Sequence, residues 1–492
     1  MDVTTRETAL SSPRSRPSAL TLPVVLAGVV LVAMSISGTA VALPGVGQDL
    51  GASGSALNWV VAGYNLAFAA MTLVAGSAAD RVGRRRTFLV SALVFSCGFL
   101  VTAVSQSIVV TDVSRIVSGA GGAGVMAAGG AILASSYEGV ARNRAFALMG
   151  TMAGVGIAVG PTLSGLLISA TGWRGSFVVF TVVGLLITTG ATRIRESRSA
   201  SGRADWPGSI LFVTALTLFM FALLEAPSLG WTHGAVVATA VGGLVTLVVF
   251  AATQRRSAAP VLDPALIANR GFLGWSLATL TTSVGFLGVL VFLPTYLQAA
   301  DLTPAASGAA MLLLTGPVLV TPLVAAVLVD KGVPAQKLIS LALGLVTVGN
   351  LWLVTLSSQH TVVAVAGPLL AIGVGMGASF GITDGQAMAL VPADSVGMAA
   401  GFLNTLRGAA EAMVIAAFGA ALLGLLGSRL GDEEQAASVS AGQLSDASRH
   451  TELAALTWSW RMTQLGISPL CLLLSITAVV LIRHHGSRRK TV

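Results

Sequence analysis

Apolar segments long enough to cross a lipid bilayer recur along nearly the whole chain. Each contains about 20 residues, the length of helix that spans the hydrocarbon core, and short polar connections separate them. Of the 492 residues, 54% are hydrophobic and only 10% are charged, whereas about 25% are charged in a typical soluble protein. The sequence therefore predicts an all-α polytopic membrane protein with no room for a large soluble domain.

Breaks at charged, proline and glycine residues divide the apolar sequence into fourteen predicted transmembrane helices. They lie at 21–43, 56–78, 87–105, 108–134, 145–169, 175–192, 208–226, 235–253, 272–298, 306–329, 338–356, 361–388, 397–426 and 464–482. This topology places 22 of the 28 Lys and Arg residues in the cytoplasm, 4 outside and 2 within spans. Because cytoplasmic loops of membrane proteins are enriched in Lys and Arg, we expect a multi-pass protein of the cell membrane with both termini in the cytoplasm.

Two basic connections, at 193–205 and 253–270, bracket spans 7 and 8 and divide the spans as six, two and six. The polar stretch 429–463 is the one long external loop of this topology, and a short interfacial helix is expected at its end. The expected parts are a cytoplasmic N-tail (1–20), an N-terminal six-helix bundle (21–195), two inserted helices (206–254), a C-terminal six-helix bundle (271–483) and a cytoplasmic C-tail (484–492).

Charge and residue usage exclude several classes of function. The net charge of +8 comes from basic residues scattered over short loops, so no patch for nucleic acid is predicted. Cys97 and Cys471 both lie in apolar segments, which argues against a disulfide framework or a thiolate metal site. The five histidines fall in loops or the tail, so neither a metal centre nor a histidine proton relay is expected within the membrane. We expect no cofactor.

Three polar residues in span 13 follow helical spacing. Asn404, Arg407 and Glu411 stand at i, i+3 and i+7, which places them within about 60° on one face of a helix. That face must point into the bundle, because polar groups that face lipid remain unsatisfied. Two interpretations stay open: the trio lines a transport cavity in which Glu411 carries a proton, or Arg407 and Glu411 form a purely structural ion pair.

Three further acids merit comparison as proton-coupling candidates. Asp112 stands three residues before Arg115 in span 4, and these two residues are expected on neighbouring helical faces. Asp384 is predicted within a turn or two of the cytoplasmic surface, where a structural role is slightly favoured over coupling. Glu225, beside Pro227 at the outer end of span 7, is interpreted as a solvated cap.

The loop "GSAADRVGRRR" after span 2 resembles a motif of the major facilitator superfamily. An acid at a helix end and a cluster of bases can form and break ion pairs while two bundles rock against each other. The alternative is that the arginines only fix the topology. The residues that match the motif are Gly76, Asp80, Arg81, Gly83, Arg84 and Arg85.

In span 5, "GIAVGPTLSG" resembles the antiporter motif of the fourteen-span drug:proton antiporter branch of this superfamily, with Ser164 in place of a glycine. Small residues four apart let helices approach closely, and a proline within a span bends its helix, which suits a flexing seam between halves. Ordinary small-residue packing is the alternative. The matching residues are Gly156, Gly160, Pro161 and Gly165.

Span 4 resembles the same branch at Arg115 and Gly119, with Ser118 where glutamine is usual. A membrane-embedded arginine requires a cavity or an acidic partner, and Asp112 could merely neutralise it. Many of these antiporters also carry an aspartate nine positions before the proline of a "VALP" stretch, where this chain has Ser35. The role of that aspartate therefore cannot be carried over.

The resemblance implies the major facilitator fold, with two six-helix bundles plus two extra central helices. It implies a monomeric secondary exporter in bacterial membranes that expels hydrophobic drugs, antibiotics or natural products in exchange for protons. Tyr64 and Asn65, in the similar stretch "NWVVAGYNLAFA" (58–69), join Asn404 as candidates to line the substrate cavity. The first alternative is a proton-coupled uptake permease of the same fold, and the second is a membrane-embedded enzyme or sensor. The sequence predicts neither the substrate nor the proton stoichiometry.

Overall fold

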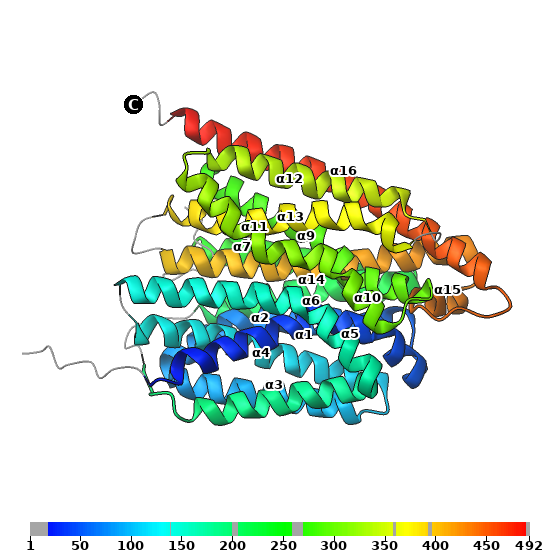
Figure 1. Cartoon of the computed structure of the whole chain (residues 1–492), viewed down its shortest axis with the longest axis horizontal. Coiled ribbons are helices and arrows are strands. Elements are labelled where there is room, and N and C mark those ends of the chain that lie inside the picture. Colours follow the sequence, from blue (N-terminus) through cyan, green and yellow to red (C-terminus); the bar gives the residue numbers. More distant parts are fainter. Residues whose placement is uncertain are drawn as a thin grey trace, which may run out of the picture.

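The computed structural model describes residues 18–137, 139–198, 205–257, 269–357, 361–391 and 396–488, and in these ranges every long element is a helix that runs roughly along one common axis (Figure 1). Twelve of the helices in these ranges are long and apolar enough to cross a membrane. One of them, α5 (Gly139–Ala191), contains two of the predicted spans, joined at Gly172, whose φ of 72° interrupts the helix. The all-helical fold is confirmed, and the number of fourteen spans stays a prediction.

The N-terminal half contains α5 and four further helices. These are α1 (Thr21–Leu50), α2 (Gly54–Val82), α3 (Arg84–Val104) and α4 (Ile108–Ser136). Small residues allow the helices to approach closely: a Cβ on Gly119 of α4 would lie 2.2 Å from the carbonyl oxygen of Tyr64 in α2. Buried Phe95, Phe99 and Phe177 fill the space between α3 and α5.

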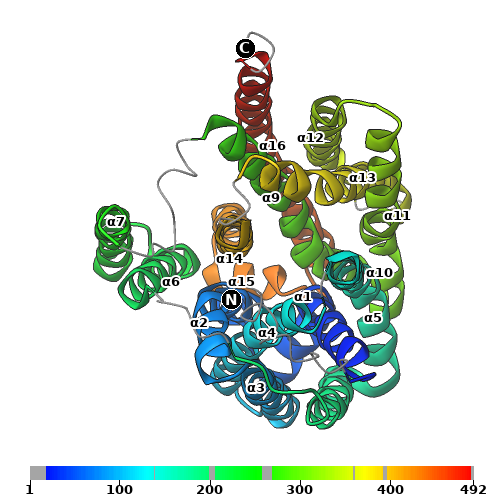
Figure 2. The same ribbon diagram turned by 90° about the vertical axis from the view of Figure 1, so that its left-hand side faces the viewer.

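The C-terminal half is arranged around α9 (Arg270–Ala299), which is buried along most of its length (Figure 2). Its neighbours include α16 (Arg449–Arg488), which is antiparallel to α9, because Gly274 contacts Ile482 while Tyr296 bonds to Thr457. The other helices of this half are α10 (Pro304–Ala310), α11 (Leu312–Asp330), α12 (Ala335–Trp352) followed by the 3-10 turn η1 (Leu353–Thr355), α13 (Thr361–Met388) and α14 (Val396–Leu430).

Two helices stand beside these halves. The pair α6 (Trp206–Leu229) and α7 (Gly234–Gln254) packs together at one side of the molecule (Figure 2). Within the pair, α6 contacts α2 of the N-terminal half and α14 of the C-terminal half. The inserted pair therefore lies against the line where the two halves meet.

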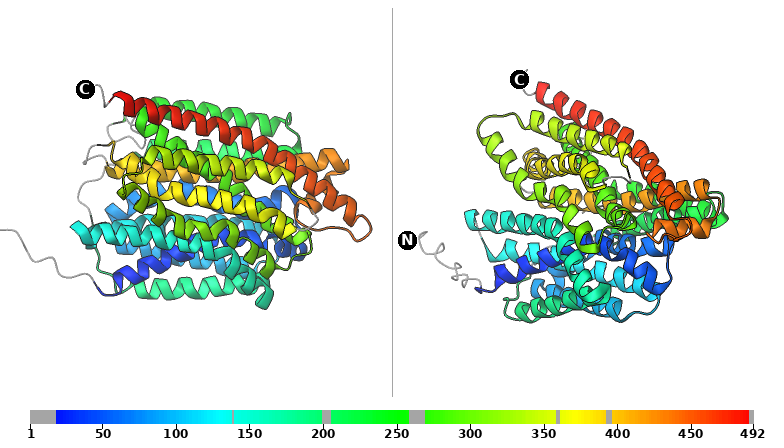
Figure 3. Two further views of the ribbon diagram at one scale, coloured as in Figure 1. Left: turned by 45° about the horizontal axis from the view of Figure 1, so that its top comes forward. Right: turned by 45° about the vertical axis from the view of Figure 1, so that its right-hand side comes forward.

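The stretch 429–463 is more helical than the sequence predicts. It contains α15 (Glu433–Ser440). Helix α16 begins at Arg449 and continues through the last predicted span, so the predicted end of the loop at residue 463 is wrong (Figure 3). Buried Glu452 in the first turn of α16 explains the early start, because it accepts three hydrogen bonds, each 2.7 Å long. The donors are Gln435 Nε2, Ser445 N and Ser448 Oγ.

Hydrogen bonds join the two halves on the side of the molecule that carries α10 and α15. Thr162 Oγ1 donates to the Gly308 carbonyl at 2.8 Å, Thr315 Oγ1 to the Ala158 carbonyl at 2.7 Å, and Gln298 Nε2 to the Val41 carbonyl at 3.1 Å. The ribbons converge at this end and diverge toward the end that carries the termini (Figure 3). The halves are thus held together at one end of the helices.

Candidate functional site

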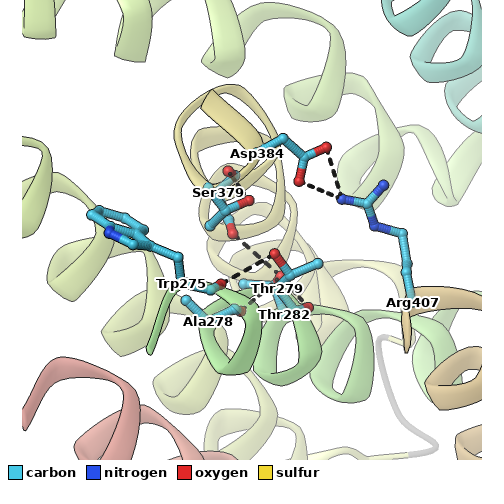
Figure 4. Close-up of polar contacts among 8 residues, drawn as sticks. Trp275, Ala278, Thr279, Thr282, Ser379, Asp384 and Arg407 are labelled. Carbon is cyan, nitrogen blue, oxygen red and sulfur yellow. Dashed lines mark hydrogen bonds and ion pairs between the residues drawn. The ribbon is translucent and has the colours of Figure 1, made fainter. Parts of the chain in front are cut away.

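An ion pair joins α14 to α13 in the C-terminal half. Arg407 Nη2 donates to Asp384 Oδ1 at 2.9 Å and to Asp384 Oδ2 at 3.2 Å (Figure 4). The Arg407 side chain is 13% exposed and that of Asp384 44% exposed. The guanidinium also lies 4.6 Å from the ring centroid of Phe380, so α13 supplies both a carboxylate and an aromatic face to Arg407.

This ion pair differs from the Arg407–Glu411 pair, which helical spacing offers as one of two interpretations. Glu411, half-buried near the middle of α14, forms no ion pair in the part of the chain that the structure describes, and Arg407 reaches across to Asp384 instead. Sequence spacing identifies neighbours on one helix but carries no information about which residue of another helix lies opposite. The third member of the predicted trio, Asn404, has its side chain outside the described residues.

Neutral hydroxyls connect α9 to α13 close to the ion pair. Thr282 Oγ1 and Ser379 Oγ lie 3.3 Å apart, and both residues are buried (Figure 4). Thr282 also bonds to the carbonyl of Thr279 one turn earlier. Asp384 therefore projects from a helix that is fixed to the central helix of this half.

Arg115 is the charged residue at the centre of the N-terminal half, and only 1% of it is exposed. Its Nη1 donates to Ser35 Oγ at 3.2 Å, its Nη2 to Thr39 Oγ1 at 3.1 Å and its Nε to the Val60 carbonyl at 3.3 Å. The Tyr64 ring centroid lies 4.3 Å from its guanidinium carbon. Helices α1, α2 and α4 thus meet at one arginine.

Asp112 does not neutralise Arg115, contrary to that interpretation of the sequence. No ion pair among the described residues joins them, and Asp112 Oδ1 is buried without a hydrogen-bond partner. The charged neighbour of Asp112 is Glu225 of α6. Glu225 itself accepts hydrogen bonds from Trp59 Nε1 at 2.9 Å and Ser55 Oγ at 3.3 Å, so it connects α6 to α2 and is not a solvated cap.

Both candidate cavity residues of α2 are fully buried. Tyr64 is 0% exposed. Asn65 donates from Nδ2 to the Val61 carbonyl one turn earlier at 2.9 Å, while its Oδ1 has no partner. Of the two, Tyr64 is the residue in contact with the buried arginine.

The loop motif between α2 and α3 is organised by a residue that the sequence analysis missed. The Glu196 carboxylate accepts hydrogen bonds from the backbone N–H groups of Arg85, at 3.0 Å, and Arg86, at 3.2 Å, at the start of α3. Gly83 has φ of 128°, and a Cβ there would lie 2.7 Å from this carboxylate. Glu196 lies in one of the two basic connections, and an acid at the N-terminus of a helix is favourable, but its distance in sequence conceals the contact.

The remaining residues of this motif have different surroundings. A Cβ on Gly76 would meet nothing within 4 Å, so this glycine is not required for close packing here. The Arg81 guanidinium carbon lies 5.8 Å from the ring centroid of Trp206 at the start of α6. Arg84 donates its backbone N–H to the Ser197 carbonyl at 3.0 Å. The side chain of Asp80 lies outside the described residues.

The glycines of the antiporter motif lie at two helix contacts. A Cβ on Gly156 would lie 2.6 Å from the Val30 carbonyl oxygen, and one on Gly160 would lie 3.2 Å from the backbone of Met34, so both glycines face α1. A Cβ on Gly165 would lie 2.4 Å from the Pro304 carbonyl oxygen of α10 in the other half. The segment that contains Pro161 thus lies at the seam between halves that the sequence analysis expects.

Comparisons with known proteins agree with the overall fold. Residues 25–415 match the sequence profile of the Major Facilitator Superfamily. Similar proteins include the multidrug resistance protein Stp of Mycobacterium tuberculosis (29% identity, 79% of this chain and 73% of Stp) and the methylenomycin A resistance protein of Streptomyces coelicolor (29% identity, 85% of this chain and 88% of that protein). The fold resembles a crystal structure of a bacterial homologue of the human lysosomal transporter Spinster, described as inward-facing and unoccupied. Its TM-score is 0.65 and its identity 15%, over 94% of this chain and 96% of that one.

Proposed function

The chain belongs to the Major Facilitator Superfamily, and we propose that it exports hydrophobic drugs, antibiotics or natural products from a bacterial cell in exchange for protons. The relatives named for resistance support export as the direction of transport, among them the tetracenomycin C resistance and export protein of Streptomyces glaucescens, 28% identical over 86% of this chain and 79% of that protein. The distribution of Lys and Arg supports a cell-membrane location with both termini in the cytoplasm.

The contacts between the halves fit an exporter in the conformation that receives substrate. If the termini are cytoplasmic, the bonds Thr162 to Gly308 and Thr315 to Ala158 close the external side of the molecule. Substrate then enters from the cytoplasm or the inner leaflet. Rocking of the two halves breaks these bonds and opens the external side, as in other transporters built from repeated bundles.

The observation that supports proton coupling is that Arg407 pairs with Asp384 while Glu411, one turn away on α14, has no ion-pair partner among the described residues. A buried carboxylate without a positive partner favours its protonated form, and an approaching guanidinium favours the charged form. The carboxyl group that Arg407 contacts directly is therefore the one whose charged form is stabilised more strongly. When Arg407 turns from Asp384 to Glu411, Glu411 releases its proton, and the reverse movement lets Glu411 take up another.

A shift of α13 relative to α14 links this exchange to the movement of the halves. The two helices meet at the Arg407–Asp384 pair, and α14 also contacts α2 of the N-terminal half, where Gly408 faces Ala69. Rocking of the halves thus changes the distance between Arg407 and Asp384. The proton on Glu411 is thereby tied to the side on which the transporter is open.

Expression of the full chain in a pump-deficient bacterial host tests the proposed function. Intracellular accumulation of a panel of hydrophobic antibiotics is measured with and without a protonophore, with the empty vector as control. We expect lower accumulation and higher resistance for at least one compound, both abolished by the protonophore. Accumulation that equals the vector control for every compound, or that ignores the protonophore, contradicts the proposal.

A further inference from the structure

The buried arginine of the N-terminal half has no ion-pair partner among the described residues. Within these residues, Arg115 and Glu452 are the charged residues that are fully buried, and Glu452 lies in the first turn of α16, in the other half. None of the ion pairs of the described residues includes Arg115. Arg115 therefore places in the interior of the N-terminal half a positive charge that no described acidic side chain pairs with.

The groups around Arg115 stabilise its charge without cancelling it. Its three hydrogen-bond acceptors are Ser35 Oγ, Thr39 Oγ1 and the Val60 carbonyl, all neutral oxygens. A guanidinium stays charged in proteins, and dipoles that solvate it leave its net charge in place. The hydroxyl of Ser35, 3.2 Å from Nη1, stands where a carboxylate would form an ion pair.

An aromatic ring also contacts the guanidinium from α2. The Tyr64 ring lies 4.3 Å from the guanidinium carbon, and Tyr64 is fully buried. The face of the ring stabilises a cation but carries no net charge, so the positive charge of Arg115 stays in place.

We infer that the N-terminal half of this transporter selects against lipophilic cations and favours lipophilic substrates that carry a carboxylate or phenolate group. In a medium of low dielectric constant one unit charge acts over a long distance, so the substrate need not touch Arg115. Repulsion of the wrong charge is as effective for selectivity as attraction of the right one. This inference rests on the proposed function, since it names the substrate class of the same transporter.

Binding of two dyes to the purified full-length protein tests the inference without any need for transport. Eosin Y is an anionic xanthene dye and rhodamine 6G a cationic one, and fluorescence polarisation gives the Kd of each. The wild type should bind eosin Y more tightly. Ser35→Asp supplies the missing carboxylate beside Nη1. It should change each Kd about tenfold, in opposite directions, and so change the ratio of the two Kd values about a hundredfold in favour of rhodamine 6G, because a unit charge roughly 10 Å away at an effective dielectric constant of about 20 has that effect on each dye.

Two further variants separate charge from shape and from folding. Ser35→Asn has the size of the aspartate variant without its charge, so it should keep the wild-type order of affinities. In the wild type, Arg115 Nη2 lies 3.1 Å from the Thr39 hydroxyl. Thr39→Asp therefore places a carboxylate next to Nη2 and should repeat the effect if Ser35→Asp fails to fold. The inference is overturned if the wild type does not bind eosin Y, if it binds rhodamine 6G at least as tightly, or if the folded aspartate variants leave the ratio unchanged. A loss of protonophore-sensitive export with the charge preference intact would instead overturn the proposed function alone.

Discussion

Arg407 and Asp384 form an ion pair that crosses from α14 to α13, with one guanidinium nitrogen 2.9 and 3.2 Å from the two carboxylate oxygens. The same arginine stands four residues before Glu411 on its own helix. Two carboxyl groups on different helices thus compete for one cation, and the movement of one helix relative to the other decides between them. The coupling proposal depends on this competition.

Asp384→Asn removes one competitor and should uncouple the transporter. Arg407 then remains beside Glu411 and keeps it charged, so we expect protonophore-sensitive efflux to fall about tenfold or more at normal membrane abundance. Because the two carboxyl groups act as a unit, the double variant with Glu411→Gln should be no worse than Glu411→Gln alone. Additive losses, measured as efflux rates of the four proteins, would show that the two carboxyl groups act independently.

Gly83→Ala should destabilise the protein, because it strains the backbone and collides with a carboxylate. The φ of 128° is unfavourable for a residue with a Cβ, and the added atom would lie 2.7 Å from Glu196. A loss of about 1–3 kcal/mol is expected, seen as a lower midpoint of thermal unfolding in detergent. Gly76→Ala is the matched control, since its Cβ would meet nothing within 4 Å, and its midpoint should equal that of the wild type. Equal midpoints for the two variants would refute the contact with Glu196.

The segment of α15 and the start of α16 should lose stability in acid through Glu452. Because α16 has 40 residues and about 20 cross a bilayer, its first turns extend beyond the predicted span 464–482. Burial raises the pKa of Glu452, but hydrogen bonds from Ser448, Ser445 and Gln435 together lower it below its ordinary value. The resulting stabilisation is present above the pKa of the unfolded chain and disappears as the pH falls through the lower pKa of the folded protein.

The corresponding measurement compares thermal midpoints of the wild type and Glu452→Gln between about pH 7 and pH 3, a range that extends below the ordinary pKa of a glutamate, about 4.3. The wild type should be the more stable of the two near neutral pH, and the difference should shrink as the pH falls. A difference that is constant over this range would assign the loss in the variant to packing alone.

Cysteine labelling tests the topology. In a version that lacks Cys97 and Cys471, a cysteine introduced at Ser440, the last residue of α15, should react with an impermeant maleimide in intact cells. A cysteine at Ser201, in the basic connection before α6, should react only after the membrane is permeabilised. Labelling of Ser201 in intact cells would require a different orientation or a different number of spans.

Local patterns in the sequence predict most of the helices but not their partners. Apolar length locates the helices, and the glycines at 156, 160 and 165 correctly indicate a tight contact with neighbouring helices. The early start of α16 escapes this reasoning, because three hydrogen bonds to Glu452 override the polar composition of its first turns.

Local patterns also fail to predict the partners of the charged residues in the candidate site. Embedded charges identify Arg115 and Arg407 as important, since a charge in a membrane needs a partner. Their actual partners come from other helices: Ser35 is 80 positions from Arg115, and Asp384 is 23 positions from Arg407. Helical spacing can propose only partners within one helix, and for both arginines it proposed the wrong one.

The central claim is that Glu411 carries the transported proton, and substrate-driven proton flux through the protein tests it most directly. The wild type and Glu411→Gln are reconstituted in liposomes with a pH-sensitive dye inside, and an exported substrate found in the accumulation panel is added to one side. We predict that the wild type moves protons in the direction opposite to the substrate. Glu411→Gln should bind the substrate within about threefold of the wild-type Kd, a change below 1 kcal/mol, but should move no protons. Proton flux at the wild-type rate in Glu411→Gln would contradict the account and transfer the coupling role to another acid.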